Sequence, residues 1–371
     1  MLLTTRWMSA LSCAGLSTTA LAASHSFDAQ HNNHERPQLP VEEQFRIHVD
    51  PTGLRIFLRH LPAAAPGMGR GRAPVLFVHG ATFPSALAAG FKFDGTSWMD
   101  DLSSKGFDVW ALDFLGYGNS DRYSEMRDAP FAHPPLGRAD SATRQIAAAV
   151  AFIIARQRVT RVSLIAHSWG TIPAGLYAGT HPDRVDRLVQ FGPVALREGI
   201  PDTAKAPAYW LVTEDAQRTR FYGYVPKGER AVLEARHFAE WGPAYIASDS
   251  ASRTRPLTSV TVPNGPSADI DDAWSGHLGY DPAAITAPVL IVRGEWDTVT
   301  KDADARWLYD ALTHSPLKRD VKISRATHVM HLEASRYQLY REVATFLVGD
   351  DTPATRIARV PAKRRESVHD E

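Results

Sequence analysis

The amino-acid sequence predicts an α/β fold, in which a mostly parallel sheet carries helices on both faces. Short runs of aliphatic and β-branched residues alternate with amphipathic segments of helical period over most of the chain. The run at 74–79 is continuously apolar, which is typical of a strand whose two faces are both covered. The chain has 371 residues, of which 44% are hydrophobic, so it is long enough to bury a core of this kind.

Strands and helices alternate through the first half of the chain. A strand pair is joined by an Asp-Pro-Thr-Gly turn, and four further apolar strands follow. The apolar residues of 140–156 recur at helical intervals, with Asp140 or Ser141 as the expected cap, and a second helix is predicted over 169–180. The strands of this half are predicted at 43–49, 54–60, 74–79, 107–112, 161–166 and 188–191.

The same alternation returns near the end of the chain. A strand is predicted at 288–292, a helix at 303–312, a strand at 321–323 and a long helix at 332–347. Strands that alternate with helices in this way form parallel sheets, because each helix carries the chain back across the sheet.

Between these two parts lies an interval that is too long for a loop, so we expect residues 196–285 to form an inserted, mainly helical cap. The core is then built from 41–195 and 286–349. The insertion is rich in aromatic residues, which either line a substrate pocket or hold a small subdomain together. They are Tyr209, Trp210, Phe221, Tyr222, Tyr224, Phe238, Trp241 and Tyr245.

Both terminal segments are expected to lie outside the folded core. Arg6 precedes a short Ala- and Leu-rich run that ends Ala-Leu-Ala, the pattern of a secretory signal peptide. The run is too short, and too often interrupted by Ser and Thr, to span a membrane. We expect residues 1–22 to be removed on export to the periplasm or the medium, with a wrongly assigned start codon as the alternative. Residues 23–40 are predicted as a polar linker and 350–371 as a flexible tail.

Composition excludes several classes of function. The 41 basic and 41 acidic side chains balance, so there is no electrostatic footprint for nucleic acid or an acidic membrane. The lone cysteine, Cys13, excludes a disulfide framework and a cysteine-based zinc site, and it lies in the expected signal peptide. We therefore expect a small-molecule substrate, no metal, no cofactor and no membrane insertion once the signal is removed. The oligomeric state is not indicated.

A candidate nucleophile lies where a buried strand meets a helix. The segment 166–170 reads Ala-His-Ser-Trp-Gly and has the strand-to-helix context of a nucleophile elbow, with Ser168 at its tip. A strained turn of this kind needs small residues two positions before and after the serine. Gly170 meets that need, and Ala166 adds one methyl group. His167 is expected to point away from the pocket as a structural histidine.

A serine needs a base to take its proton and a third group to orient that base. Asp297 and His328 each follow a predicted strand, and catalytic groups of open α/β sheets gather beyond the carboxyl ends of the strands. We therefore expect these two residues to converge on Ser168. His331 is the rival base and is expected to start the final helix. The rival acids are Glu295, Asp302 and Asp304.

Two backbone N–H groups are expected to form an oxyanion hole. Trp169, which opens the helix after the serine, supplies one of them. The other comes from the turn after a His-Gly pair, with Ala81 as the favoured donor and Thr82 as the second choice. Thr82 and Trp296 are the predicted substrate-binding residues, because they adjoin these positions.

The chain resembles the α/β-hydrolase superfamily over residues 43 to 349. The motifs are Val-His-Gly-Ala at 78–81, Asp-Phe-Leu-Gly-Tyr-Gly-Asn-Ser at 113–120, the elbow, Gly-Glu-Trp-Asp at 294–297, and Thr-His-Val-Met-His-Leu-Glu at 327–333. The resemblance implies a sheet of about eight strands, a lid formed by the insertion, and a tight bend fixed by Asp113. The chain departs from most members at Ala166, although some bacterial lipases also have Ala-His-Ser there.

The expected function is an exported serine hydrolase that cleaves a carboxylic ester or lactone of a small to medium apolar or aromatic substrate. A serine nucleophile disfavours the haloalkane dehalogenase and epoxide hydrolase branches, which use an aspartate. One alternative is a peptidase or amidase similar to proline iminopeptidase, in which Glu214, Glu234 or Glu240 would hold a substrate ammonium. Another is a ligand-binding protein that kept the fold and lost turnover.

Overall fold

A computed structural model describes residues 40–49, 51, 53–64, 71–201 and 205–349. The predictions made for 1–22, for 350–371 and for nearly all of 23–40 lie outside these residues. Within the part of the chain that is described, no helix combines the length and the apolar character that crossing a bilayer requires.

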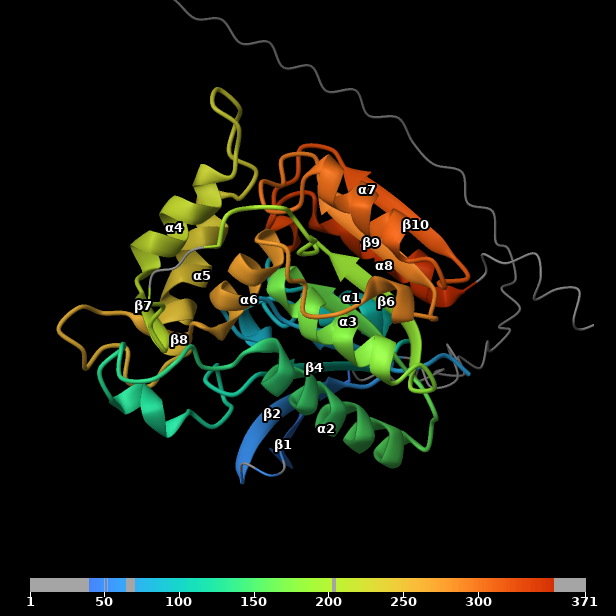
Figure 1. Ribbon diagram of the computed structural model, residues 1–371, viewed down its shortest axis with the longest axis horizontal. Helices are drawn as coiled ribbons and strands as arrows, with labels where there is room; N and C mark the ends of the chain where they lie inside the picture. The colour runs from blue at the N-terminus through green and yellow to red at the C-terminus, as the bar shows by residue number, and fades with distance from the viewer. Residues whose placement is uncertain (1–39, 50, 52, 65–70, 202–204, 350–371) are drawn as a thin grey trace, which may run out of the picture. The chain divides into compact units, whose positions relative to one another are not determined.

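The core is one eight-stranded sheet with the spatial order β1-β2-β4-β3-β5-β6-β9-β10 (Figure 1). The strands from β4 to β10 in this order run parallel, and β1 and β2 form an antiparallel edge. The predicted fold class is therefore confirmed. In chain order, the strands are β1 (Glu43–Val49), β2 (Leu54–Leu61), β3 (Val75–Val78), β4 (Val109–Asp113), β5 (Val162–His167), β6 (Val185–Phe191), β9 (Val289–Gly294) and β10 (Lys318–Ile323).

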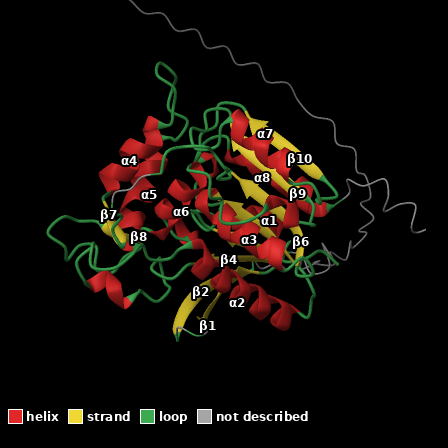
Figure 2. Cartoon of the chain, viewed as in Figure 1, coloured by secondary structure: helices red, strands yellow, loops and turns green. Residues whose placement is uncertain are grey.

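Helices cover the sheet, which explains why its central strands are mostly apolar. Every residue of β3, β4, β5 and β9 is buried. Figure 2 shows the helices around the sheet, where α2 packs against α3 and α1 packs against α8. The α-helices outside the insertion are α1 (Trp98–Ser104), α2 (Ala139–Gln157), α3 (Thr171–Thr180), α7 (Asp302–Ala311) and α8 (Arg336–Val348).

Two predicted helix starts are wrong. Helix α2 begins at Ala139, and neither Asp140 nor Ser141 caps it; the carboxylate of Asp269, from a distant part of the chain, accepts the Ala139 N–H at 2.7 Å. The final helix begins at Arg336 rather than at Leu332, because the preceding residues form a separate 3₁₀ turn, Met330–Leu332. His331 therefore lies in that turn and not at the start of the helix.

The described residues of the insertion form three α-helices and an antiparallel strand pair, which lie together beside the sheet in Figure 1. Its buried aromatic side chains pack on one another and on the core. The Trp241 ring stacks on Tyr245 at 5.1 Å and meets Phe83 edge to face at 5.3 Å. The elements are β7 (Tyr209–Val212), α4 (Glu214–Gly223), α5 (Ala235–Ala247), β8 (Val260–Pro263) and α6 (Gly265–Trp274).

The motif at 113–120 forms the expected tight bend. The Asp113 carboxylate accepts the N–H of Asn119 at 3.1 Å and the N–H of Ser85 at 2.9 Å. Gly116 and Gly118 have φ values of 87° and 49°, which favour glycine. The bend therefore joins the end of β4 to the loop that follows β3.

Candidate active site

Ser168 directly follows β5 and is the first residue of a 3₁₀ turn, Ser168–Gly170, that leads into α3. Its φ is 56°, a left-handed conformation that costs a residue with a side chain about 1–3 kcal/mol. A side chain at Gly170 would collide with the His79 carbonyl oxygen, and one at Gly80 would lie 3.0 Å from the Ser168 Cβ. The close approach of these backbones explains the small residues of the motif. The side chain of Ala166 is fully buried within β5.

The structure brings the three predicted residues together. His328 Nε2 lies 2.8 Å from Ser168 Oγ, and its Nδ1 lies 3.0 and 3.1 Å from the two carboxylate oxygens of Asp297. Backbone N–H groups of Val299 and Thr300 donate to Asp297 Oδ1 at 2.8 and 2.9 Å, so the carboxylate is held in place. Ser168, Asp297 and His328 are all buried. This is the geometry of a nucleophile, a base and an orienting group.

The rival acids serve elsewhere in the structure. Glu295 accepts the Arg325 N–H at 2.9 Å, Asp302 pairs with Arg293 at 2.6 Å, and Asp304 pairs with Arg197 at 2.6 Å. None of them contacts His328.

The two neighbouring histidines are buried against His328. The expectation that His167 points away from the pocket is wrong: it lines the cavity at Ser168, and its Nε2 lies 3.0 Å from the His328 carbonyl oxygen. Burial lowers the pKa of His331 to about 3, with the nearby His328 as a second cause. Both its ring nitrogens are buried without a hydrogen-bond partner among the described residues. His331 therefore stays neutral and has no contact with Ser168 through which to act as its base.

A cavity of about 180 Å³ opens at Ser168. Ala81 and Thr82 line it, as expected for the turn after β3. The Trp169 side chain turns away and donates from Nε1 to Asp269 at 2.8 Å, so only its backbone remains a candidate oxyanion donor. Trp296 does not line this cavity; its ring lies under the Arg325 guanidinium, 5.2 Å from the ring centroid. The substrate-binding role of Trp296 therefore gains no support from this cavity and stays a prediction.

Sequence reasoning missed several residues of the cavity wall. Arg220 and Tyr224 come from the end of α4, and Trp274 comes from the end of α6. Of the eight aromatic residues named in the insertion, Tyr224 alone is among the residues that line the cavity. Most of these aromatics therefore hold the insertion on the core, and no local motif distinguishes those that reach the site.

Gly192 is a further residue that the sequence did not reveal. It follows β6 with a φ of 54°, and a Cβ there would lie 3.0 Å from the His328 ring and 3.2 Å from Asp297 Oδ2. The absence of a side chain therefore leaves room for the histidine–aspartate pair.

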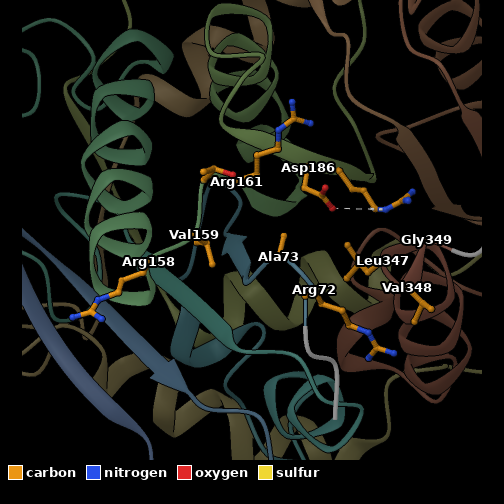
Figure 3. A pocket seen from close by; sticks show the side chains of 12 residues that line it. Arg72, Ala73, Arg158, Val159, Arg161, Asp186, Leu347, Val348 and Gly349 are labelled. Carbon is orange, nitrogen blue, oxygen red and sulfur yellow. Dashed lines mark ion pairs between the residues drawn. The ribbon is translucent and has the colours of Figure 1, made fainter. Parts of the chain in front are cut away.

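A second cavity, of about 550 Å³, lies at the opposite edge of the sheet (Figure 3). It is lined by residues next to the amino ends of the strands, among them Ala73, Arg161 and Asp186. Among the described residues that line it, one ion pair is present: Arg187 Nε lies 3.9 Å from Asp186 Oδ2, as the dashed line shows. The candidate active site lies at the carboxyl edge, where ligands of open α/β sheets bind. Among the described residues, no group of three or more His, Cys, Asp or Glu side chains is arranged to hold a metal ion.

Solved structures with a similar fold differ in activity. A bromoperoxidase from Bacillus anthracis is 16% identical with a TM-score of 0.56, and the match covers 83% of this chain and 100% of that one. Epoxide hydrolase A from Mycobacterium thermoresistibile is 16% identical with a TM-score of 0.55 and coverages of 83% and 99%. Serine hydrolase CCSP0084 from Cycloclasticus zankles, a bacterium that degrades polyaromatic hydrocarbons, is 14% identical with a TM-score of 0.54 and coverages of 84% and 100%. At these identities the likeness shows the fold alone.

Sequence comparison identifies the family. No curated protein sequence gives a match. The family model described as "alpha/beta hydrolase fold" matches residues 73–335, well over half of the chain and including Ser168, Asp297 and His328. The chain therefore belongs to the alpha/beta hydrolase fold family.

Proposed function

We propose that this protein is a serine hydrolase that cleaves a carboxylic ester or lactone through an acyl-enzyme. The observation that carries the proposal is the hydrogen-bonded series from Ser168 Oγ through the His328 ring to the Asp297 carboxylate, inside a cavity. A serine hydroxyl is a weak nucleophile until a neighbouring base accepts its proton. His328 is within reach of that proton, and Asp297 holds the imidazole in the orientation needed.

The reaction then follows two acyl-transfer steps. Ser168 Oγ attacks the substrate carbonyl carbon while its proton moves to His328 Nε2. The negative charge on the carbonyl oxygen is stabilised by the backbone N–H groups of Ala81 and Trp169, each contributing on the order of 10²–10³ in rate. The tetrahedral intermediate expels the alcohol, which takes the proton from His328. A water molecule, activated by the same histidine, then releases the acid and restores Ser168.

The site favours a small substrate. Its volume of about 180 Å³ is below the range of roughly 300–1,000 Å³ found for sites that hold drug-sized ligands. The similar solved structures do not decide the reaction, because a serine hydrolase, an epoxide hydrolase and a bromoperoxidase are all among them. A serine at the elbow supports acyl transfer.

The peptidase alternative has less support. It needs a carboxylate to hold the substrate ammonium, and neither Glu214, Glu234 nor Glu240 lines the cavity at Ser168. The wall carries the guanidinium of Arg220 instead.

One experiment tests the proposal against both alternatives. The protein and its Ser168→Ala variant are incubated with a fluorophosphonate probe, then with p-nitrophenyl esters and proline p-nitroanilide. We expect Ser168-dependent labelling and ester turnover. Anilide turnover without ester turnover would favour the peptidase, and no labelling of the wild type would favour a binding protein without turnover.

The choice of base is tested in the same assay. We expect His328→Ala to lose activity by at least about a thousandfold, because Ser168 then lacks its base. His331→Ala should lose less than about tenfold, since this ring does not contact Ser168, although removing a buried ring costs stability of about 2–4 kcal/mol. His331→Phe, which preserves most of the packing volume, serves as the folded control. Equal losses in His328→Ala and His331→Phe would contradict the assignment.

We also propose that the enzyme acts outside the cytoplasm. The proposal rests on the basic residue, apolar run and Ala-Leu-Ala sequence within residues 1–22. Mass spectrometry of the protein from the periplasm or medium is expected to show a chain that begins at residue 23. An intact chain that starts at Met1 and stays in the cytoplasm would overturn it.

A further inference from the structure

The wall of the cavity at Ser168 carries a positive charge that the proposed reaction does not use. Arg220, in the last turn of α4, lines this cavity together with Ala81, Thr82 and Tyr224. None of the residues that line it is an aspartate or a glutamate. A guanidinium remains charged at any pH the protein meets. The cavity is therefore positively charged on the side formed by the insertion.

Within the described residues, Arg220 forms no ion pair. Its Nη2 donates to Thr82 Oγ1 at 2.6 Å, while its Nε is buried without an acceptor. Two other arginines with little exposure have carboxylate partners: Arg197 pairs with Asp304 at 2.6 Å, and Arg336 pairs with Asp94 at 3.1 Å. A partly buried charge without a counterion carries a desolvation cost that an incoming anion offsets.

The guanidinium is also held in position. It lies over the Phe221 ring, 5.1 Å from the ring centroid, and the bond to Thr82 ties it to the turn that follows β3. Thr82 directly follows Ala81, the proposed oxyanion donor. A group bound by Arg220 would therefore lie beside the reacting carbonyl, within the same small cavity. A carboxylate matches the donors of a guanidinium in both charge and planar geometry.

Tyr224 adds a second donor at the same wall. Burial raises the pKa of its hydroxyl, so the group stays protonated at neutral pH and can donate to an anion. Its ring centroid lies 5.9 Å from that of His328, which places it next to the reacting groups.

We infer that Arg220 binds a carboxylate of the substrate, so that the enzyme cleaves a small ester or lactone that carries a carboxylate close to its scissile bond. This inference rests on the proposed hydrolase function and names its substrate class. It departs from the expectation of an apolar or aromatic substrate.

Two pairs of esters test the inference. Ethyl hydrogen succinate and ethyl butyrate differ by a carboxylate in place of a methyl group on the acyl side. The acetyl ester of lactic acid and isopropyl acetate differ in the same way on the alcohol side. At pH 7 the wild type should prefer the carboxylate ester of at least one pair by tenfold or more in kcat/KM. No preference in either pair overturns the inference.

A matched pair of variants locates the preference. Arg220→Met should lower the ratio of the two kcat/KM values at least tenfold in the preferred pair. Arg218→Met removes an arginine from the same helix that pairs with Glu214 at 3.7 Å and does not line the cavity, and it should keep the wild-type ratio. A ratio unchanged in Arg220→Met, or lowered equally in both variants, contradicts the role of Arg220.

A measurement on the wild type alone covers the case in which Arg220→Met does not fold. Butyrate should protect Ser168 from fluorophosphonate labelling at a concentration at least tenfold lower than butyramide does. Equal protection overturns the inference. Labelling and neutral-ester turnover without any carboxylate preference leave the hydrolase function intact and remove only this inference, whereas absence of labelling removes the proposed function itself.

Discussion

Gly192 lies directly behind the His328–Asp297 pair, and its missing side chain leaves room for both. Its φ of 54° would strain any residue with a Cβ by about 1–2 kcal/mol. The Cβ would also press on the His328 ring from 3.0 Å. At this position two requirements coincide, one of backbone conformation and one of space at His328, the proposed catalytic base.

Gly192→Ala should therefore lower kcat in addition to lowering stability. Displacement of a catalytic group by a fraction of an ångström to 1 Å can cost up to about 10²-fold in rate, so we expect a loss of about ten- to a hundredfold in kcat. Gly228→Ala is the control, because Gly228 also has a positive φ, of 92°, with nothing within 4 Å of the added Cβ. Ester turnover and thermal unfolding of both variants check the prediction. A Gly192→Ala enzyme as active as Gly228→Ala would show that the ring does not need this space.

At the scale of elements, Asp269 joins α6 of the insertion to two elements of the core. Its Oδ2 accepts the N–H of Ala139 at the start of α2 and the indole N–H of Trp169, at 2.7 and 2.8 Å. Its Oδ1 pairs with Arg138 at 2.6 Å. A single buried carboxylate thus caps one helix and holds the residue that follows Ser168.

Asp269→Ala should destabilise the protein and slow the reaction. Two donors would be left without acceptors, at a cost of about 1–3 kcal/mol each for buried groups, and Trp169 would lose its anchor. Asp272→Ala is the matched control: it lies on the same helix and also pairs with Arg138, but its side chain is half exposed, so its loss should cost at most about 1 kcal/mol. Chemical denaturation and kcat measure both effects. Equal losses of stability in the two variants would contradict the linking role of Asp269.

The positions of Ser168, Asp297 and His328 could be predicted because each of these residues follows a strand that the sequence indicates. The largely apolar runs of β5 and β9 and the shorter Val-Lys-Ile segment of β10 are bounded by turn residues, and the carboxyl ends of parallel strands meet at one edge of the sheet. This geometry is enough to expect that Ser168, Asp297 and His328 converge. It also favours Asp297 over Asp302 and Asp304, which lie further from the end of the strand.

The residues that shape the cavity could not be predicted, because they depend on how separate elements meet. Arg220 lies on a polar helix whose docking on the core depends on buried aromatics such as Phe221, and nothing in its local sequence indicates the cavity. The cap of α2 could not be predicted for the same reason, because Asp269 lies in α6, 130 residues further along the chain. Trp296 adjoins Asp297 in sequence, yet the strand end turns its ring toward Arg325.

At the scale of the whole molecule, the protein buries a carboxyl group beneath the loop that carries His328. Glu333 accepts hydrogen bonds from the N–H of Thr327, at 3.1 Å, and from its hydroxyl, and the side chain is fully enclosed. Burial raises the pKa of Glu333 to about 7, although the hydrogen bonds from Thr327 act in the opposite direction. The folded state therefore holds a proton on this group at a pH at which the unfolded chain has released it.

This difference makes the free energy of unfolding depend on pH. An acid whose pKa is higher in the folded state stabilises the fold fully below the unfolded value, near 4.5, and that stabilisation is lost as the pH rises through about 7. The difference of pKa corresponds to about 3 kcal/mol between these limits. Glu333→Gln keeps the size and the hydrogen-bonding capacity of the side chain but cannot ionise, so the variant should lack this component.

We therefore expect the wild type to lose about 3 kcal/mol relative to Glu333→Gln between pH 4.5 and pH 8, as measured by chemical denaturation at each pH. The other titrations are common to both proteins and cancel in the difference. Glu295→Gln is the control of opposite sign, because the N–H of Arg325 lowers the pKa of this exposed carboxylate. Its stabilising effect is present at neutral pH and disappears as the pH falls through the folded pKa. A difference between wild type and Glu333→Gln that stays constant with pH would show that Glu333 ionises in the folded protein as it does in the unfolded chain.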